Sequence, residues 1–494
     1  MWDKASLHDL IATKMSGYQM IVVANREAYI HRFNGDTIEC LRPASGMAAA
    51  LDPVMKAAGG VWIGHGSGDA DRATVDESDH VAVPPEDPAY TLRRVWLTKE
   101  EEEGYYHGLA NEGLWPLCHT TFTRPVFQLK DWETYRKVNA LFGDAVLEEA
   151  DDRPTFVFIQ DYHFGLLPRY LKDRNPNLIV AQFWHIPWPN RETFRVFPWK
   201  EELLDGLLGN DLLGFHLRYH CQNFIETVDR TIEARIDHEQ SEVVRNGKST
   251  LVRPFPISID FERQTALAMG SDVEQEIKKL KRQLRQRGDI LGVGIERIDY
   301  TKGIPERLQA LDRFFERFPE YRERLTYIQV GVPSRGHIPS YRAIDEEIDC
   351  LVERINWKWS TSKWRPVIYF KRHFSMVEMA ALHRMADYFI VSSLHDGMNL
   401  VAKEFVASRM DEDGVLLLSQ FAGSALELTD AILFNPFAID EMAEAIHQAV
   451  EMPAAERKKR MQRMRSAVQD NNVYRWAGKI LSALLKFDIP EVPE

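Results

Sequence analysis

The sequence predicts an α/β protein built on parallel sheets. Short apolar, β-rich runs recur along the 494-residue chain, and amphipathic stretches separate them. Because these runs are apolar throughout rather than alternating, we expect strands that are buried on both faces, as in parallel sheets. The predicted strands are residues 20–24, 155–160, 178–184, 212–216, 290–296, 325–331, 366–371, 388–393 and 414–419.

The stretches between the strands predict helices, as in GIPERLQALDRFFERFPEY and SMVEMAALHRMADY. A stretch with two prolines, RPFPISIDFERQ at residues 253–264, follows a polar, charged region and predicts a domain boundary. We therefore expect an N-terminal domain over residues 1–260 and a C-terminal domain over residues 261–465, each with its own sheet. Residues 466–494 are expected to form a C-terminal helix that packs back on the N-terminal domain.

Charge and composition exclude several classes of function. A net charge of −13 argues against a nucleic acid as the main partner. The apolar runs are too short to span a bilayer, and the N-terminus lacks the features of a signal peptide. The cysteines are far apart and form no C-x-x-C pair, which argues against a disulfide framework or a zinc site. We therefore expect a cytoplasmic protein. The four cysteines are Cys40, Cys118, Cys221 and Cys350.

Polar side chains follow the predicted strands in both halves of the chain. Ligands of open parallel sheets bind beyond the carboxyl ends of the strands, so these residues are the first candidates for a site. Since both halves carry them, we expect a ligand in a cleft between two domains. The candidates are Asn25-Arg26, Asp161-Tyr162-His163 and His185 in the first half, and Arg297, Lys302-Gly303, Ser334-Arg335 and His395-Asp396 in the second.

The stretch HDGMNLVAKEF, residues 395–405, joins a predicted strand to a predicted helix. The first N–H groups of a helix lack partners and carry a positive dipole, so a phosphate is well placed there. Gly397 lets a ligand approach the backbone, and the carboxylate of Glu404 can accept hydrogen bonds from a ribose diol. The stretch therefore suits a nucleotide. The residues alone leave open an ordinary N-cap formed by Asn399 or Asp396, with Glu404 exposed to solvent.

Two cations in ERIDYTKG, Arg297 and Lys302, favour the nucleotide. Fixed cations near a diphosphate neutralise its charge as it leaves. Surface salt bridges with Glu296 or Asp299, or a Schiff-base role for Lys302, are the alternatives. Nothing else in the chain resembles a pyridoxal site, and GVGIERIDY lacks the G-x-G-x-x-G spacing of a nicotinamide site.

Other constellations give weaker signals. Asp69-Ala70-Asp71 has the D-x-D pattern of a metal site, but its Gly, Ser and Arg neighbours favour a surface loop. His216 and His220 have the i, i+4 spacing of zinc ligands, but no third ligand is evident nearby, so packing or exposure is favoured. Asp161 and Asp396 are candidates for the facing carboxylates of a glycosidase, at a separation that the sequence does not give.

The motifs NR, GLWP, QDYH, HIPWP, ERIDYTKG, PSRG, DGMNLVAKE and SQFAGSALEL together resemble the trehalose-6-phosphate synthase family, in its order, from about residue 20 onward. The resemblance implies the GT-B architecture, in which two Rossmann-like domains with parallel sheets face an interdomain cleft. It implies a retaining glucosyltransferase that moves glucose from UDP-glucose or a similar nucleotide sugar to glucose 6-phosphate, which gives α,α-trehalose 6-phosphate. It implies small-molecule substrates as partners, with no required metal or other cofactor, and leaves a homo-oligomer open.

The resemblance also implies a role for each matching residue. The catalytic residues would be Arg297, Lys302, His185 and Asp396. The donor would be bound by Gly46, Arg297, Lys302, Gly397, Met398, Asn399, Leu400, Val401 and Glu404. The acceptor would be bound by Arg26, His65, Tyr106, Trp115, Asp161 and Arg335.

Three positions depart from the common pattern of the family. Ser45 replaces the first glycine of a pair, His65 stands where a tryptophan is common, and His395 replaces an arginine. These changes bear on the acceptor more than on the chemistry. The alternatives are therefore the same transfer to another phosphorylated acceptor, as in glucosylglycerol-phosphate synthases, or a non-catalytic sugar-phosphate sensor. Asn25-Arg26 and His163 favour the trehalose-6-phosphate synthases, because the glucosylglycerol pattern usually differs there.

Overall fold

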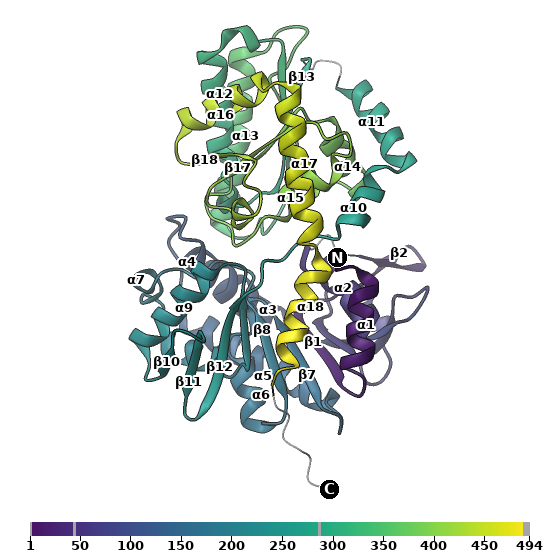
Figure 1. Cartoon of the computed structure of the whole chain (residues 1–494), viewed down its shortest axis with the longest axis vertical. Coiled ribbons are helices and arrows are strands. Elements are labelled where there is room, and N and C mark those ends of the chain that lie inside the picture. The colour runs from purple at the N-terminus through teal and green to yellow at the C-terminus, as the bar shows by residue number, and fades with distance from the viewer. Residues whose placement is uncertain (1, 43–45, 285–287, 488–494) are drawn as a thin grey trace. The chain divides into compact units, whose positions relative to one another are not determined.

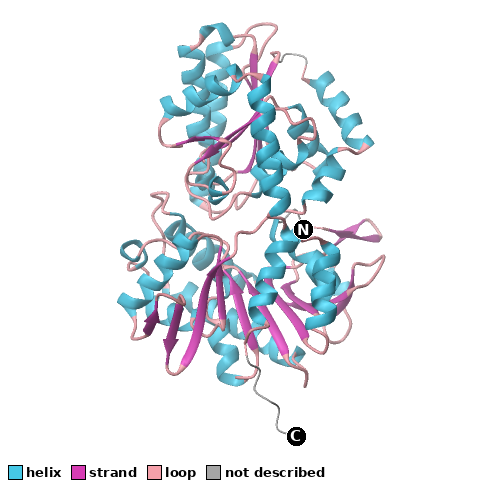
Figure 2. Cartoon of the chain, viewed as in Figure 1, coloured by secondary structure: helices cyan, strands magenta, loops and turns pink. Residues whose placement is uncertain are grey.

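The computed structural model describes residues 2–42, 46–284 and 288–487. The chain divides into two compact units (Figure 1). One unit comprises the chain up to Ile257 together with the residues from Val473 onward, and the other runs from Ser258 to Asn472. Strands and helices alternate along both units (Figure 2), as the sequence predicts for an α/β protein.

The first unit is built on a mainly parallel sheet in the order β10-β11-β12-β9-β8-β7-β1-β4-β6-β5. The segment from β12 to β6 is parallel throughout, while β5, β10 and β11 pair antiparallel at its edges. The parallel strands follow the chain outward from β1 to β6 on one side and from β7 to β12 on the other. The order therefore reverses between β1 and β7, and such a switch point is where open α/β sheets bind ligands.

The strands of the first unit are β1 (Gln19–Arg26), β4 (Val61–His65), β5 (His80–Val83), β6 (Tyr90–Val95), β7 (Thr155–Gln160), β8 (Ile179–Phe183), β9 (Leu212–Phe215), β10 (Arg235–Asp237), β11 (Glu242–Arg245) and β12 (Lys248–Pro254), with a separate hairpin of β2 (Ile30–Asn34) and β3 (Thr37–Leu41). Its α-helices are α1 (Lys4–Lys14), α2 (Gly46–Ala58), α3 (Lys99–Glu102), α4 (Trp115–His119), α5 (Leu129–Glu149), α6 (Leu167–Arg174), α7 (Arg191–Phe194), α8 (Lys200–Leu207), α9 (Arg218–Thr231) and α18 (Val473–Leu484). Short 3₁₀ turns η1 (Asp71–Ala73) and η3 (Tyr162–Phe164) and a π-helix η2 (Glu103–Leu114) complete it.

The C-terminal helix α18 packs on the sheet of the first unit. Its Trp476 meets Phe158 of β7 and Phe183 of β8, with ring centroids 6.2 and 5.4 Å apart. Trp2 lies so close to Gly478 that a Cβ atom on the glycine would collide with the indole. The segment around Trp2 thus packs against the C-terminal helix α18 within one unit.

The second unit is built on a parallel sheet in the order β15-β14-β13-β16-β17-β18, with its reversal between β13 and β16. Its strands are β13 (Ile290–Arg297), β14 (Leu325–Val332), β15 (Val367–Phe370), β16 (Tyr388–Val391), β17 (Val415–Ser419) and β18 (Ile432–Phe434). Its helices are α10 (Phe261–Ala268), α11 (Ser271–Gln283), α12 (Ile304–Arg317), α13 (Pro339–Trp359), α14 (Met376–Met385), α15 (Leu400–Ser408), α16 (Ile439–Glu451) and α17 (Ala454–Asp470), with 3₁₀ turns η4 (Tyr300–Lys302), η5 (Pro319–Tyr321) and η6 (Gly423–Leu426).

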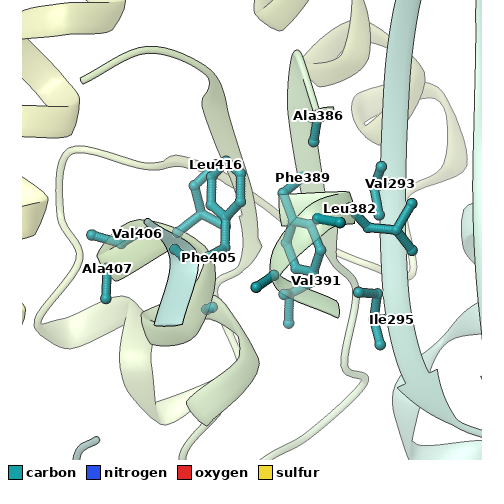
Figure 3. Packing of buried hydrophobic residues seen from close by; sticks show 14 of the residues in the cluster. Val293, Ile295, Leu382, Ala386, Phe389, Val391, Phe405, Val406, Ala407 and Leu416 are labelled. Atoms are coloured by element: carbon teal, nitrogen blue, oxygen red, sulfur yellow. The ribbon is translucent and has the colours of Figure 1, made fainter. Parts of the chain in front are cut away.

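This second sheet is buried on both faces because alternate residues of its strands enter two different cores. Phe389 and Val391 of β16 pack with α10, α11, α14, α15 and α17, whereas Tyr388 and Ile390 pack with α12, α13 and α16. Figure 3 shows the first of these cores, with Phe405 of α15 beside Phe389. The two rings stack with their centroids 4.9 Å apart, which packs α15 against β16.

All nine strands that the sequence predicts are present, and residues 155–160 match β7 at both ends. The sequence does not predict β4 and β6, whose apolar runs are interrupted by a glycine in β4 and by two arginines in β6. These two strands extend the sheet on the side of β1 and carry His65 and a buried arginine, Arg94.

Candidate active site

The switch point of the second unit brings together the polar residues that follow β13 and β16. These strands are parallel neighbours, so their carboxyl ends share one edge of the sheet. Arg297 is the last residue of β13 and is exposed, and Asp396 lies five residues beyond β16. The main chain of Asp396 also forms an isolated parallel bridge with Ala422, which lies beyond β17. The edge therefore presents a cation and a carboxylate on adjacent strand ends.

Lys302 and Asp396 form an ion pair at this edge, with 2.6 Å between Nζ and Oδ2. Ser393 and Asn399 also donate to Oδ2, at 3.2 and 3.3 Å. Burial opposes the charge on Lys302, but the carboxylates of Asp396 and Glu296 outweigh it and raise the pKa of the ammonium. A lysine held charged is a poor nucleophile, which argues against a Schiff-base role.

A buried arginine supports the turn that carries Lys302. Arg307 has no exposed surface and donates to Ser392 Oγ at 2.9 Å and to Glu296 Oε1 at 3.2 Å. Ser392 in turn donates to the main-chain oxygens of Lys302 and Gly303, at 3.0 and 2.7 Å. The salt bridge of Glu296 is therefore with Arg307, and this network has no local sign in the sequence.

The start of α15 presents main-chain N–H groups without internal partners. Asn399 is the N-cap, and its side chain accepts from the N–H of Ala402 at 3.0 Å. Within the described part of the chain, the N–H groups of Met398, Leu400 and Val401 have no acceptor. Such a helix start attracts an anion. The ordinary N-cap and the anion site thus coexist, because the cap satisfies only one of the free donors.

Glu404 lies one turn into α15 and is half-buried rather than solvated. Burial raises the pKa of its carboxyl from 4.5 to about 7. None of the described side chains donates to it, whereas the neighbouring Lys403 pairs with Glu427 at 3.1 Å. A half-buried carboxyl to which none of the described side chains donates is suited to receiving hydroxyl groups from a ligand.

Asp299 interacts with two candidate cations of the second unit, Arg297 and Arg335. It is fully buried and caps the turn η4 by accepting from Thr301. Arg335 lies 3.9 Å from it, and Tyr341 donates to it at 3.2 Å. Burial would raise the pKa of Asp299, but Arg297 and Arg335 lower it. Arg335, expected on the acceptor, therefore lies in the same unit as the donor candidates.

In the first unit, Arg26 and His65 lie side by side at the ends of β1 and β4. They form a register pair after a bulge that begins at Val23. Arg26 is exposed and donates to Tyr106 Oη at 3.3 Å. A ring nitrogen of His65, Nδ1, lies 3.1 Å from the carbonyl of Val95. Bulges commonly re-aim a side chain next to a functional site.

Asp161 and His185 lie on the other side of the switch point, after β7 and β8. Asp161 has a φ of 71°, and its Oδ1 accepts from the N–H groups of Tyr162 and His185 at 2.9 and 3.1 Å. His185 Nε2 lies 3.0 Å from Gln160 Oε1. Burial lowers the pKa of His185 to about 3, so the imidazole is neutral. A positive φ outside glycine is strained and is often found at functional sites.

Aromatic side chains complete this edge of the first unit. Tyr106 comes from the π-helix η2 and stacks on His163, with centroids 5.6 Å apart. Trp115 begins α4 and lies 6.0 Å from the ring of Tyr162. Gly46 is the first residue of α2, while Ser45 lies outside the described residues. π-Helical segments are rare in proteins, and those that do occur often lie at functional sites.

Two weaker sequence signals have structural explanations. The expected surface loop at Asp69-Ala70-Asp71 is wrong for Asp71, which is fully buried because Arg94 and the main chain around His31 and Gly68 surround its carboxylate. His216 precedes α9, so it does not share a helix face with His220, and both are buried.

No metal-binding cluster of three or more His, Cys, Asp or Glu side chains occurs among the described residues. In that same part of the chain, none of the helices combines the length and hydropathy that a bilayer crossing requires. Asp161 and Asp396, the candidates for facing carboxylates, belong to different units.

Comparisons with known proteins agree with this architecture. The model of glycosyltransferase family 20 matches residues 18–486. A trehalose-6-phosphate synthase from Mycolicibacterium vanbaalenii is 35% identical over 480 residues, which are 95% of this chain and 96% of that protein. An E. coli structure described as trehalose-6-phosphate bound with UDP-2-fluoro glucose superposes with a TM-score of 0.85, at 31% identity, over 95% of this chain and 99% of the other.

An alpha,alpha-trehalose-phosphate synthase from Burkholderia xenovorans in complex with glucose-6-phosphate superposes with a TM-score of 0.84, at 29% identity. That match covers 94% of this chain and all of the other. The fold is therefore that of the GT-B glycosyltransferases. The family match spans both units and every candidate residue named above. This chain belongs to glycosyltransferase family 20.

Proposed function

We propose that this glycosyltransferase moves glucose from UDP-glucose to glucose 6-phosphate with retention of configuration and so produces α,α-trehalose 6-phosphate. The observation that carries the proposal is the switch point of the second unit, where two cations, a carboxylate and a free helix start share one edge. The names of the relatives, and the ligands of the E. coli and B. xenovorans structures, support the choice of substrates.

The donor's diphosphate fits the charges of the second unit. Arg297 and Lys302 supply the cations, and the main-chain N–H groups of Leu400 and Val401 supply hydrogen bonds. Glu404, one turn further, receives the ribose hydroxyls, and Gly46 meets the diphosphate from the first unit's α2. These groups stabilise the charge that develops on the leaving phosphate.

The transferred glucose meets Asp396 and the neighbouring amides of Gly397, Met398 and Asn399. Asp396 accepts hydrogen bonds only, so it selects for sugar hydroxyls. His185 contributes as a neutral ring. Because the amide oxygen of Gln160 only accepts, the short contact places the proton on Nε2 and leaves Nδ1 as an acceptor for a sugar hydroxyl.

The acceptor's phosphate is bound by Arg26, Tyr106 and Arg335, with Trp115, Asp161 and His65 around its sugar. An arginine suits a phosphate because its planar fork donates two hydrogen bonds at once. Arg26 already points at Tyr106, so the two groups form one donor set. His65, in place of a common tryptophan, adds a polar ring beside Arg26.

The chemistry needs no nucleophile from the protein. The acceptor hydroxyl attacks on the face that the phosphate leaves, and the departing phosphate oxygen takes the hydroxyl's proton. The protein orients the two sugars and stabilises the leaving group. We also propose that transfer requires no metal or other cofactor and that the protein works in the cytoplasm, where nucleotide sugars are found and thiols stay reduced.

The test is nucleotide release from UDP-glucose and GDP-glucose, with glucose 6-phosphate or glycerol 3-phosphate as acceptor, with and without EDTA. Release that requires glucose 6-phosphate and survives EDTA is the expected result. Release only with glycerol 3-phosphate would mean a different product, and would indicate that His65 and its loop determine the choice of acceptor. Nucleotide binding without release would favour a sensor.

A further inference from the structure

Three ionisable side chains of the first unit are buried together directly behind Arg26 and His65. Glu27, Asp71 and Arg94 each have no exposed surface. Arg94 Nε donates to Glu27 Oε2 at 2.8 Å, and its Nη2 lies 2.8 Å from Asp71 Oδ1. We call these three residues the buried charge cluster. The proposed function does not use any of them.

Stability alone is a poor explanation for this cluster. Removing charges from water costs several kcal/mol for each ion by rough estimate, and well-packed apolar residues in the same space are often equally or more stabilising. The cluster is nevertheless fully bonded. Arg94 also donates to the carbonyl of Asp71 and to Thr74, both at 2.7 Å, and contacts His31 Nδ1 at 2.7 Å. Such a network fixes geometry more than it adds free energy.

Two of the proposed acceptor residues, Arg26 and His65, are each linked to the cluster through a neighbouring residue. Arg26 precedes Glu27 in the chain, and its carbonyl accepts from Trp62 Nε1 at 3.2 Å. His65 contacts the carbonyl of Val95, the residue after Arg94. The cluster therefore holds both ends of the register pair that Arg26 and His65 form.

The loop after His65 is clamped by the same carboxylates. Glu27 Oε1 accepts from the N–H of Ser67 at 3.0 Å, and Asp71 Oδ2 accepts from the N–H of Gly68 at 2.6 Å. A Cβ atom on Gly64 would come within 3.1 Å of the Glu27 backbone, and one on Gly68 would collide with the His31 carbonyl. The loop is thus packed closely against Glu27 and the start of β2.

From this geometry we infer that the buried charge cluster is a positioning device for the acceptor, acting through Arg26 at its phosphate and through His65 beside its sugar. This inference rests on the proposed function, in which those two residues meet the acceptor. Preorganising a donor such as Arg26 lowers the entropy lost when a phosphate binds. Glu27, Asp71 and Arg94 are accordingly positioning residues and do not touch the substrate.

The protonation of Glu27 makes the effect of the cluster depend on pH. Burial and the neighbouring carboxyl of Asp71 raise the pKa of Glu27 to about 8 against the attraction of Arg94. The charged or titratable side chains that contact Glu27 and its partners are Arg94 from β6, Asp71 from η1 and His31 from β2. Above that pH, Glu27 becomes a second carboxylate beside Asp71, and the cluster that positions Arg26 and His65 gains a negative charge.

The experiment measures kcat and KM for glucose 6-phosphate, the Kd of UDP and thermal unfolding in Glu27→Gln, Arg94→Met and Arg94→Lys. We expect KM to rise roughly tenfold or more in Arg94→Met and less in Arg94→Lys, which keeps the charge, with the Kd of UDP unchanged. In the native protein KM should rise above a pH of about 8, and in Glu27→Gln this rise should be absent.

Asp211→Asn is the matched control. Asp211 pairs with Lys172 at 2.7 Å and accepts from the N–H of Val180, so it is a carboxylate of the same sheet at the opposite, amino-terminal edge. Its substitution should lower the unfolding temperature without changing KM. The inference would be overturned if every cluster variant had the KM for glucose 6-phosphate of the native protein. It would also be overturned if KM had the same pH profile in Glu27→Gln as in the native protein. Absence of native turnover with glucose 6-phosphate would instead reject the proposed function, and with it the inference.

Discussion

The two switch points share one design but differ in how their polar groups are held. Each lies where a parallel sheet reverses its order, and each has a fully buried arginine behind it, Arg94 in one unit and Arg307 in the other. In the second unit the candidate residues bind one another, as Lys302 and Asp396 do. In the first unit Asp161 and His65 bind the main chain, while Arg26 and His185 each contact an uncharged side chain, Tyr106 and Gln160.

This difference indicates two ways of preorganising a site. The paired charges of the second unit can exchange partners when a diphosphate binds, because Lys302 is already charged and is held in place by Asp396. The groups of the first unit are aimed by backbone and by a buried network and need no such exchange. We therefore expect substitutions in the second unit to affect turnover most and those in the first to affect acceptor binding.

The largest effect is expected for Arg297→Ala. Loss of a cation that stabilises the leaving phosphate should lower kcat by about 100-fold to 1000-fold. The affinity for glucose 6-phosphate, measured by calorimetry, should change little. Arg313→Ala is the control, since it removes an exposed arginine of the same unit that pairs with Asp440 at 2.7 Å. Such surface pairs contribute little to stability. Turnover that survives in Arg297→Ala would contradict our account of leaving-group stabilisation.

The next effect concerns Arg335, which the structure places against Asp299. If Arg335 binds the acceptor's phosphate, Arg335→Ala should raise KM for glucose 6-phosphate by roughly 10-fold to 100-fold, as expected for a lost hydrogen bond to a charged group. KM for UDP-glucose should stay within about twofold, because no donor contact is removed. Steady-state kinetics with each substrate varied in turn separate the two. A rise confined to the donor would assign Arg335 to the diphosphate and sharpen the contrast between the units.

The strands and the residues at their ends can be predicted from the sequence because both are local signals. A run such as TFVFIQ indicates a buried strand, and the parallel sheet then places the next residues at a known edge. The partners of those residues come from far along the chain and have no local signature. Lys302 and Asp396 are 94 residues apart, and Arg94 reaches Glu27 across 67. The polar neighbours of Asp71 predict a surface position, whereas its burial depends on that distant arginine.

The smallest effect is expected at Glu404, where the pH dependence gives the sharper test. Its carboxyl has a pKa of about 7 in the ligand-free protein. Only the carboxylate form accepts two hydroxyl donors, so the Kd of UDP-glucose should fall as pH rises through 7. Glu404→Gln should bind the donor roughly tenfold more weakly at pH 8 and show no such slope. An unchanged slope in the variant would assign the titration to another group.

Glu404 also predicts a conflict between donor binding and stability. Its folded pKa lies above the unfolded value of 4.5, so protonation favours the folded protein, and this contribution is lost as pH rises from 4.5 through 7. Glu404→Gln should therefore raise the unfolding temperature of the ligand-free protein more at pH 8 than at pH 5. A carboxylate of the first unit that is satisfied by main-chain N–H groups, such as Asp161, has no such buried, unbonded charge to relieve. Asp161→Asn should then give no gain in unfolding temperature at either pH, and a gain there would remove the contrast between the two switch points.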